Sequence, residues 1–518
     1  MRGGSSGRQI ALTLRFYLGN LSINNFMKVI ISKRNENEIH IDCEQHVLYE
    51  LQEFFTFDVE GASFSPAYRK KYWDGRIRLL SVAKQTLSAG LTYRLCKALD
   101  KFGYAWDFKD NKYYGVPYET DQRVFYEGVE LFMNKISGIK PREYQVDTVF
   151  HALKEYRKTI VSPTGSGKSL MIYAIARYIK SIGKRALVVV PSKGLVEQMT
   201  GDFADYGWDT DENVHKIYQG HSLDTTAPVT VSTWQSIYGL DKKWFRQFDC
   251  IIGDECHNFK AKSLQNIMNK CPDAKWRYGF TGTLDGKNVN KLILEGLFGP
   301  VYKTTSSADL MEKGFLAKLN VDIITLKHEP KKFDNYNEEI EYLGLHENRN
   351  RFICNLANDL RGNVLVLFTR VEGQGIPMAE MMKELSQRPV HLIYGDVKVK
   401  EREEVRKIAE TSDNNIIFGS YGTMSTGVNI KNLHHVVFAS PSKSRIRVLQ
   451  SIGRGLRKAK NKESAKLHDI SDDFRFPHGK NNFTLNHLAE RIKYYIDENF
   501  EYRMIEVPIN TGVGVLSL

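Results

Sequence analysis

The sequence predicts an α/β fold, with two doubly wound parallel-sheet domains behind a small α+β domain. A strand, a glycine-rich loop and a helix follow one another across Thr159–Lys180, the context that a phosphate-binding loop requires. Apolar runs typical of buried parallel strands occur at Ala186–Val190 and, much later, at Val364–Phe368. Strand–helix alternation continues after the second run without another such loop, which indicates a second doubly wound domain.

Length and composition bound the class of protein. The 518 residues suffice for about three domains, and 42% hydrophobic with 26% charged residues is typical of a soluble globular chain. The net charge of +12 favours a polyanionic partner. The six cysteines form no C-x-x-C pair, so we expect reduced thiols in the cytoplasm. No apolar run approaches the ~20 residues that span a bilayer, so no membrane partner is expected.

The chain divides into five expected segments. Residues 1–26 begin with a Gly/Ser-rich stretch and make a poor secretory signal, because Arg15 interrupts their apolar run. We treat them as an extension outside the fold. We expect a small α+β domain at 27–115, the first α/β domain at 116–305, the second at 306–480 and a helical tail at 481–518.

The small domain carries a basic and aromatic stretch, YRKKYWDGRIR, at Tyr68–Arg78. Asp74-Gly75 is a turn signal, so we predict a hairpin there. Cations suit a phosphate backbone, and an aromatic ring can stack on a base. The alternative, a solvated basic hairpin with Trp73 in the core, stays open. The candidate nucleic-acid contacts here are Arg69, Lys70, Lys71 and Trp73.

The stretch SPTGSGKS at Ser162–Ser169 predicts a nucleotide site. Glycines allow the backbone to approach a phosphate closely, and the loop N–H groups and helix N-terminus face it. Lys168 is expected to bind the β/γ-phosphates of ATP and Ser169 to give a hydroxyl to Mg²⁺. An ordinary turn is the alternative. The candidate ATP-binding residues are Gln145, whose amide can read adenine, with Pro163, Thr164, Gly165, Ser166, Gly167, Lys168 and Ser169.

An apolar strand ends in two acids at CIIGDECH, Cys250–His257. Asp254 at a strand end is expected to hold Mg²⁺, and Glu255 to orient and deprotonate the attacking water. A surface turn could have the same composition, but a phosphate loop precedes these acids at single-domain distance.

A basic helix near the C-terminus reads QSIGRGLR, Gln450–Arg457. Arg454 and Arg457 are three residues apart on one helical face, so both can reach one target. With a phosphate loop in the chain they are expected to act as arginine fingers on the γ-phosphate. Without it, a basic surface helix would be the better interpretation.

Taken in order, these blocks resemble superfamily 2 helicases of the DECH/DEAH-like type. The matching stretches are residues 141–145, 162–169, 191–199, 230–235, 254–257, 281–283, 364–370, 420–429 and 450–457. The resemblance implies two RecA-like domains with ATP between them and a nucleic-acid strand across both. Where the family usually has an acid after Thr-Gly-Val, this chain has Asn429.

The resemblance also implies roles for individual residues. Thr281, Gly282 and Thr283 would couple hydrolysis to strand movement, Gly427 would line the nucleotide site, and Gln450 would join the catalytic residues. Helix capping is the plainer interpretation of the hydroxyls that follow the strands. The implied strand contacts are Ser192, Lys193, Thr233, Trp234, Thr369, Arg370, Ser420 and Thr423.

A closer resemblance is to phage recombination helicases of the UvsW type. It rests on Phe54–Phe57, Tyr72–Leu80, Asn432–Val437 and the short tail. It implies an ATP- and Mg²⁺-dependent DNA helicase for branched DNA, active in branch migration, fork regression and R-loop unwinding. Single-strand-binding or recombination proteins would be its partners, and the host cytoplasm its location. A double-strand DNA translocase, an RNA helicase and a binding protein with a non-catalytic core remain alternatives.

Overall fold

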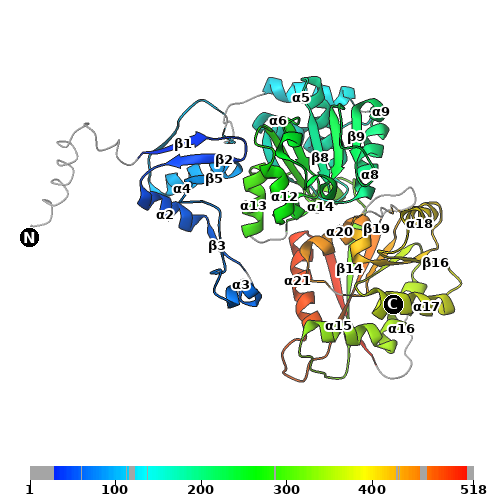
Figure 1. Cartoon of the computed structure of the whole chain (residues 1–518). Coiled ribbons are helices and arrows are strands. Elements are labelled where there is room, and N and C mark those ends of the chain that lie inside the picture. The colour runs from blue at the N-terminus through cyan, green and yellow to red at the C-terminus, as the bar shows by residue number, and fades with distance from the viewer. Residues whose placement is uncertain are drawn as a thin grey trace, which may run out of the picture.

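The computed structural model describes residues 28–59, 61–112, 114–115, 123–136, 138–284, 288–426, 430, 432–440, 442–455 and 464–509. Within them the chain forms a small α+β domain and two α/β domains, each built on a seven-stranded sheet (Figure 1). We call them the N-terminal domain, domain 1 and domain 2. The predicted fold class is confirmed, and the expected extension at 1–26 lies outside the described residues.

The N-terminal domain is a four-stranded sheet, in the order β5-β2-β1-β6, packed on helices α2 and α4. Val47, Leu51, Leu95 and Leu99 are buried against the apolar face of β1 and β2. Its elements are β1 (Val29–Lys33), β2 (Glu38–Asp42), α2 (Gln45–Phe54), β3 (Thr56–Asp58), a 3₁₀ turn (Ala62–Phe64), α3 (Pro66–Arg69), β4 (Arg76–Arg78), β5 (Thr86–Ser88), a 3₁₀ turn (Ala89–Leu91), α4 (Thr92–Phe102) and β6 (Trp106–Phe108).

The hairpin predicted within Tyr68–Arg78 is wrong. Strand β4 pairs with β3, with Phe57 opposite Ile77, and Asp74-Gly75 leads into β4 instead of closing a tight turn. Pro66 begins the short helix α3, because proline presets the backbone angle of a first helical turn. Residues 61–78, which we call the arm, therefore project from the domain, with α3 held away from the sheet (Figure 1).

The N-terminal domain is docked on domain 1 through α13 (Asn288–Phe298). Leu292 enters the core of the N-terminal domain, and Arg94 forms a bidentate ion pair with Glu295. Gly90 lies so close to α13 that a Cβ there would stand 2.0 Å from the Glu295 carbonyl oxygen. This contact joins the N-terminal domain to α13, which begins five residues after Thr283.

Domain 1 has an all-parallel sheet in the order β13-β7-β12-β11-β8-β10-β9. Its five-residue apolar strand β8 is buried throughout, as the sequence predicts. The elements are α5 (Arg123–Ile136), α6 (Glu143–Glu155), β7 (Arg157–Val161), α7 (Lys168–Ser181), β8 (Ala186–Val190), α8 (Lys193–Asp205), α9 (Thr210–Asn213), β9 (Val214–Ile217), β10 (Val229–Thr233), α10 (Trp234–Ile237), α11 (Lys242–Phe245), β11 (Cys250–Gly253), a 3₁₀ turn (Cys256–Lys260), α12 (Lys262–Asn269), β12 (Trp276–Thr281), α13 and β13 (Val301–Lys303).

Domain 2 has a second all-parallel sheet in the order β16-β17-β15-β18-β19-β14-β20. Its elements are α14 (Ser307–Glu312), β14 (Lys318–Lys327), α15 (Tyr336–Leu345), α16 (Glu347–Asp359), β15 (Val364–Phe368), a π-helical turn η5 (Val371–Gly375), α17 (Ile376–Leu385), β16 (Val390–Ile393), α18 (Val399–Thr411), β17 (Ile416–Ser420), α19 (Tyr421–Thr426), β18 (His435–Phe438), α20 (Arg445–Gly455), β19 (Ser464–Asp473), α21 (Phe483–Asp497) and β20 (Glu501–Pro508).

The tail expected to be helical is helical only in part. After α21 the chain forms β20, which pairs in parallel with β14 over eight residues. Ile505 and Val507 pack into the domain 2 core, so burial of these two side chains favours a strand. Among the described residues no helix is long and apolar enough to cross a membrane.

Candidate functional site

The parallel sheet of domain 1 brings the predicted ATPase residues together. Strands β7, β12 and β11 are neighbours, and the carboxyl ends of parallel strands meet at one edge of a sheet. The phosphate loop follows β7, Thr281–Thr283 ends β12, and Asp254 with Glu255 follows β11. Three stretches far apart in the sequence thus form one constellation.

The backbone of the phosphate loop requires glycine at two positions. Gly165 and Gly167 have φ values of 83° and 82°, a left-handed conformation that side chains rarely adopt. A Cβ on Gly165 would lie 2.6 Å from Leu316 Cδ2, and one on Gly167 would lie 2.3 Å from Gln145 Nε2. The loop is therefore shaped by close packing as well as by φ.

Hydrogen bonds from neighbouring side chains support the phosphate loop. Gln145 Nε2 and the Tyr144 hydroxyl both donate to the Ser166 carbonyl, at 2.8 and 2.7 Å. Gln145 Oε1 accepts from the Arg142 amide at 2.9 Å, so the amide predicted to read adenine is used within the protein here. Lys168 Nζ donates to the Ser162 carbonyl at 3.1 Å, which places its ammonium group beside the loop.

The two acids of the site lie in different environments. Asp254 is 7% exposed, and burial raises the pKa of its carboxyl, with the charge of Glu255 adding to the effect and Lys168 opposing it. Glu255 has a left-handed backbone with φ of 47°. Its Oε2 lies 3.4 Å from His257 Nδ1, and the same ring nitrogen lies 2.9 Å from Thr281 Oγ1.

Helix α20 of domain 2 reaches across to this constellation. Gln450 Nε2 donates to Glu255 Oε2 at 3.3 Å. A Cβ on Gly453 would lie 2.4 Å from the Thr164 Cβ, so the helix packs directly on the phosphate loop. The Arg454 side chain, Arg457 and Gly427 lie outside the described part of the chain, and their predicted roles stay predictions.

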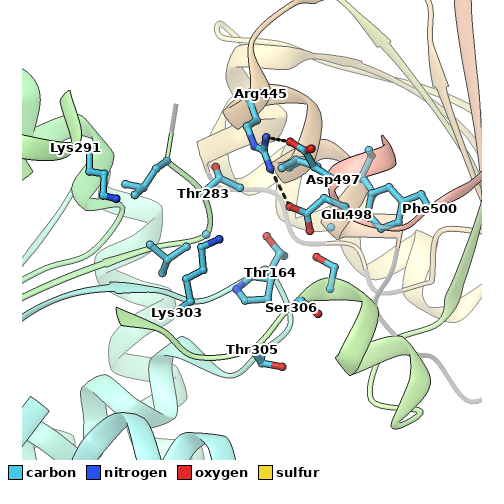
Figure 2. A pocket seen from close by; sticks show the side chains of 18 residues that line it. Thr164, Thr283, Lys291, Lys303, Thr305, Ser306, Arg445, Asp497, Glu498 and Phe500 are labelled. Carbon is cyan, nitrogen blue, oxygen red and sulfur yellow. Dashed lines mark hydrogen bonds and ion pairs between the residues drawn. The ribbon is translucent and has the colours of Figure 1, made fainter. Parts of the chain in front are cut away.

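A cavity of about 590 Å³ lies between the two domains beside the phosphate loop (Figure 2). This volume is typical of ligand sites. Lys291 and Lys303 reach it from domain 1, while Arg445 is bound to Asp497 at 2.5 Å on the domain 2 side. Its remaining lining includes Pro163 and Thr164 of the phosphate loop, with Gly282 and Thr283, which follow β12.

The donor groups present fit Mg²⁺. A carboxylate, Asp254, and a hydroxyl, Ser169, are the oxygen ligands that this ion prefers, and it usually completes its shell with waters and substrate phosphates. No cluster of three or more His, Cys, Asp or Glu side chains suited to a metal occurs among the described residues. Asp254 is buried beside a second acid, which favours a bound cation.

The predicted strand contacts of domain 1 also meet at the carboxyl edge. Strands β8 and β10 are neighbours, so Ser192 and Lys193 lie near Thr233 and Trp234. Lys193 is exposed, with its ammonium 4.7 Å from the Tyr218 ring centre. Thr233 is 6% exposed and its hydroxyl is 2.9 Å from that of Ser236, a capping-like contact.

Domain 2 repeats this arrangement. Strands β15 and β17 are neighbours, which brings Thr369 and Arg370 to the same edge as Ser420 and Thr423. Ser420 Oγ donates to Thr423 Oγ1 at 2.9 Å, and both residues are buried. Arg370 is partly exposed and lies 3.8 Å from Glu341. The structure thus gathers the candidate contacts of both domains at the carboxyl edges of the sheets.

Sequence reasoning missed three residues that shape the site. His257 links Glu255 to Thr281, Tyr144 supports the loop, and Gly453 allows α20 to approach it. Each stands inside a recognised block, so the signal was its position beside a predicted site residue. The contact partner of each is distant in sequence, and no local pattern reports it.

Comparisons with known proteins agree with this geometry. Three family models match: "DNA helicase UvsW, N-terminal" at residues 30–110, "Type III restriction enzyme, res subunit" at 138–286 and "Helicase conserved C-terminal domain" at 348–459. The ATP-dependent DNA helicase uvsW of Enterobacteria phage T4 is 34% identical over 506 residues, which cover 92% of this chain and 99% of that protein.

Solved structures also match this chain. The crystal structure of T4 UvsW is 33% identical, with 93% of this chain and 100% of that chain covered and a TM-score of 0.49. The DNA-bound Type ISP restriction-modification enzyme LlaBIII shares the fold at 15% identity, with 73% and 32% covered and a TM-score of 0.55. The identity to the phage protein extends over almost the whole of both chains, so this chain belongs to the UvsW family of ATP-dependent DNA helicases in superfamily 2.

Proposed function

We propose that this helicase acts on branched DNA, in branch migration, fork regression and R-loop unwinding. The observation that carries the motor part is the convergence of the phosphate loop, Glu255 and Gln450 at one interdomain cleft. The branched substrate is supported by the match of residues 30–110 to the UvsW N-terminal family and by the arm that projects from that domain.

The chemistry follows from the residues at the cleft. Lys168 binds the β/γ-phosphates, and Glu255 orients a water and accepts its proton as the oxygen attacks the γ-phosphorus. The bond from the γ-phosphorus to the bridging oxygen breaks, and ADP leaves. Arg454 and Arg457 stabilise the charge on the transferred group. Mg²⁺, held by Asp254 and Ser169, would neutralise the phosphates.

Hydrolysis is coupled to strand movement through hydrogen bonds in our proposal. The His257 ring lies within reach of both Glu255 and Thr281, and Thr281 Oγ1 also donates to the Thr283 carbonyl at 2.9 Å. A change at the γ-phosphate can therefore move Thr281–Thr283, and through α13 the docked N-terminal domain.

The arm has the features of a nucleic-acid contact. Tyr72 is 84% and Phe64 is 78% exposed, and rings in that state can stack on unpaired bases. Trp73 is partly exposed, and its indole N–H donates to the Arg76 carbonyl at 2.8 Å. Trp73 thus supports the arm, and Tyr72 is the better stacking candidate. We infer that Arg69, Lys70 and Lys71, all exposed, contact phosphates.

ATPase activity with four nucleic acids side by side tests this proposal. We expect single-stranded DNA and four-way junctions to stimulate hydrolysis more than RNA or plain duplex, and junctions to be migrated. Stimulation by duplex alone would favour a translocase, stimulation by RNA alone would favour an RNA helicase, and binding without hydrolysis would favour a non-catalytic core. We also propose action in the host cytoplasm together with single-strand-binding or recombination proteins.

Charge reversal on the arm is expected to separate junction binding from ATP hydrolysis. Replacing Arg69, Lys70 and Lys71 by Glu should weaken junction binding roughly tenfold or more and flatten its salt dependence, since each lost phosphate contact removes counterion release. ATPase activity with single-stranded DNA should stay within about twofold, because the motor residues lie elsewhere. Fluorescence anisotropy across a salt series measures the binding.

The matched control makes the same charge change on the body of the N-terminal domain, at the exposed Lys97, Lys101 and Lys109. It should weaken junction binding much less. If the folded arm variant binds and migrates junctions like the wild type in moderate salt, the arm is not the junction reader.

A further inference from the structure

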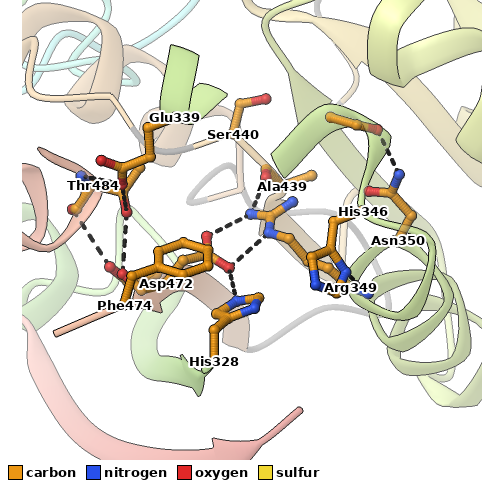
Figure 3. Close-up of polar contacts among 12 residues, drawn as sticks. His328, Glu339, His346, Arg349, Asn350, Ala439, Ser440, Asp472, Phe474 and Thr484 are labelled. Atoms are coloured by element: carbon orange, nitrogen blue, oxygen red, sulfur yellow. Dashed lines mark hydrogen bonds and ion pairs between the residues drawn. The ribbon is translucent and has the colours of Figure 1, made fainter. Parts of the chain in front are cut away.

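Domain 2 contains a fully buried ion pair at the carboxyl edge of its sheet (Figure 3). Arg349, near the start of α16, donates from Nε to Asp472 Oδ1 at 2.8 Å and from Nη2 to Oδ2 at 2.9 Å. Both side chains are 0% exposed. His328 Nε2 lies 2.9 Å from the same carboxylate. None of these residues belongs to the ATPase constellation, so their function is unassigned.

The guanidinium also binds a loop that follows β18. Arg349 Nη2 donates to the Ala439 carbonyl at 2.7 Å, and Gln374 Nε2 donates to the same oxygen at 3.4 Å. The next residue, Ser440, donates its hydroxyl to Gln374 Oε1. Ser440 Oγ in turn accepts the Thr369 amide N–H at 3.0 Å. A continuous set of hydrogen bonds therefore joins Asp472 to Thr369.

The segment after Thr369 has an unusual conformation. Val371–Gly375 forms a π-helical turn, a geometry that is rare and is frequent at functional sites. It is held by close packing: a Cβ on Gly375 would lie 2.3 Å from the Phe368 ring, and one on Gly344 of α15 would lie 2.6 Å from the Gly373 carbonyl. Gln374, 3% exposed, is the polar residue of this turn that faces the buried pair.

We propose that Arg349 and Gln374 are positioning residues for the nucleic-acid strand in domain 2. They clamp the Ala439 carbonyl and Ser440, and these fix Thr369 and the π-helical turn beside Arg370. The inference rests on the proposed strand contacts of Thr369 and Arg370. In the low-dielectric interior these buried hydrogen bonds are strong and favour one arrangement of the groups around them. A binding site for the strand needs its contacts held in such a defined geometry.

The chain offers a control on the same helix. Arg388 Nη1 donates to the Leu360 carbonyl at 2.6 Å, just past the C-terminal end of α16. It also donates to the carbonyl of Asn358, the next-to-last residue of α16, at 3.1 Å. It thus supports α16 at the amino edge of the sheet, away from the strand contacts. Arg349→Lys and Arg388→Lys both keep the charge and lose the planar fork of donors, so both test damage to α16.

Two readouts separate positioning from mere stability. The first is hydrogen exchange of the segment 364–375, which contains the Thr369 amide. The second is the concentration of single-stranded DNA that half-saturates ATP hydrolysis. Arg349→Lys and the near-isosteric Gln374→Met should speed exchange in that segment and raise half-saturation roughly fivefold to tenfold, the size of a lost buried hydrogen bond. The KM for ATP should change less than about twofold, since coupling falls off with distance.

The control and the double variant sharpen the result. Arg388→Lys should leave hydrogen exchange in 364–375 and the half-saturating DNA concentration at wild-type values, even where it lowers the melting temperature. Combining Arg349→Lys with Gln374→Met should raise half-saturation little beyond the larger single effect, because both act through Ala439. If Arg349→Lys does not fold, Gln374→Met carries the test alone.

Three outcomes would overturn the inference: unchanged exchange in 364–375, faster exchange with unchanged DNA half-saturation, or an equal effect of Arg388→Lys. The second outcome would also show that Thr369 and Arg370 do not contact the strand. Absence of any DNA stimulation in the wild type is a different failure: it would refute the proposed function and, because no strand is then held, this inference with it.

Discussion

Replacing Glu255 by Gln is expected to lower ATP turnover by roughly 10²–10⁴-fold, the contribution of a positioned general base. ATP binding should be retained, because an amide of the same size replaces the carboxylate. The structure supports this role, since Glu255 is held by Gln450 and His257 at the interdomain cleft. Single-turnover hydrolysis and binding of a fluorescent ATP analogue measure the two quantities separately.

Two further variants bracket this result. Lys168→Ala should weaken both ATP binding and turnover, because the ammonium contacts the phosphates. Glu127→Gln, on the exposed face of α5 where Glu127 pairs with Arg123, removes the same charge away from the cleft and should change neither. Wild-type hydrolysis by Glu255→Gln would sink the assignment.

Arg457→Ala is expected to reduce turnover by roughly 10³-fold or more, as for other arginine fingers, with ATP affinity changed far less. The arginine acts from domain 2 only when the cleft closes on ATP, so it stabilises the transition state more than the bound substrate. Helix α20, which ends at Gly455, lies at the cleft, since Gln450 contacts Glu255 and Gly453 packs on Thr164. Steady-state kinetics give kcat and KM.

The control for this prediction is Arg361→Ala, which removes the same charge at the exposed amino edge of the domain 2 sheet. It should leave kcat within about twofold, as for distant surface substitutions. Equal losses of affinity and turnover in Arg457→Ala would instead indicate a structural role for that arginine. Arg454→Ala, measured in parallel, shows whether the two arginines act together.

The positions of the main buried strands and of the ATPase blocks along the chain were predicted from the sequence alone. Runs such as Ala186–Val190 are apolar at every position because both faces of a parallel strand are buried. The loop at Ser162–Ser169 can be recognised from the sequence because its glycines and lysine must be close to one another in the chain. Covalent neighbours keep their spacing in any fold, so local patterns were sufficient for these predictions.

The arm and the tail show where local patterns failed. Asp74-Gly75 resembles a hairpin turn, but β4 pairs with β3, whose residues lie eighteen or more positions away in the sequence. Glu501–Pro508 follows a helix and has only a weak strand pattern, and it forms a strand because it pairs with β14. Pairing with a distant strand decided both elements, and the energy of such pairing depends on side chains that the local sequence does not contain.

Only the tertiary structure shows which side chains of the site are hydrogen-bonded to one another. Gln145 was predicted to read adenine, which stays a prediction, and the structure shows its amide donating to the Ser166 carbonyl. His257 joins Glu255 to Thr281, and the buried Arg349–Asp472 pair supports Thr369 through Ala439 and Ser440. A hydrogen bond needs two groups within about 3 Å in a defined direction. The sequence supplied the groups, but only folding brought residues more than a hundred positions apart to that distance.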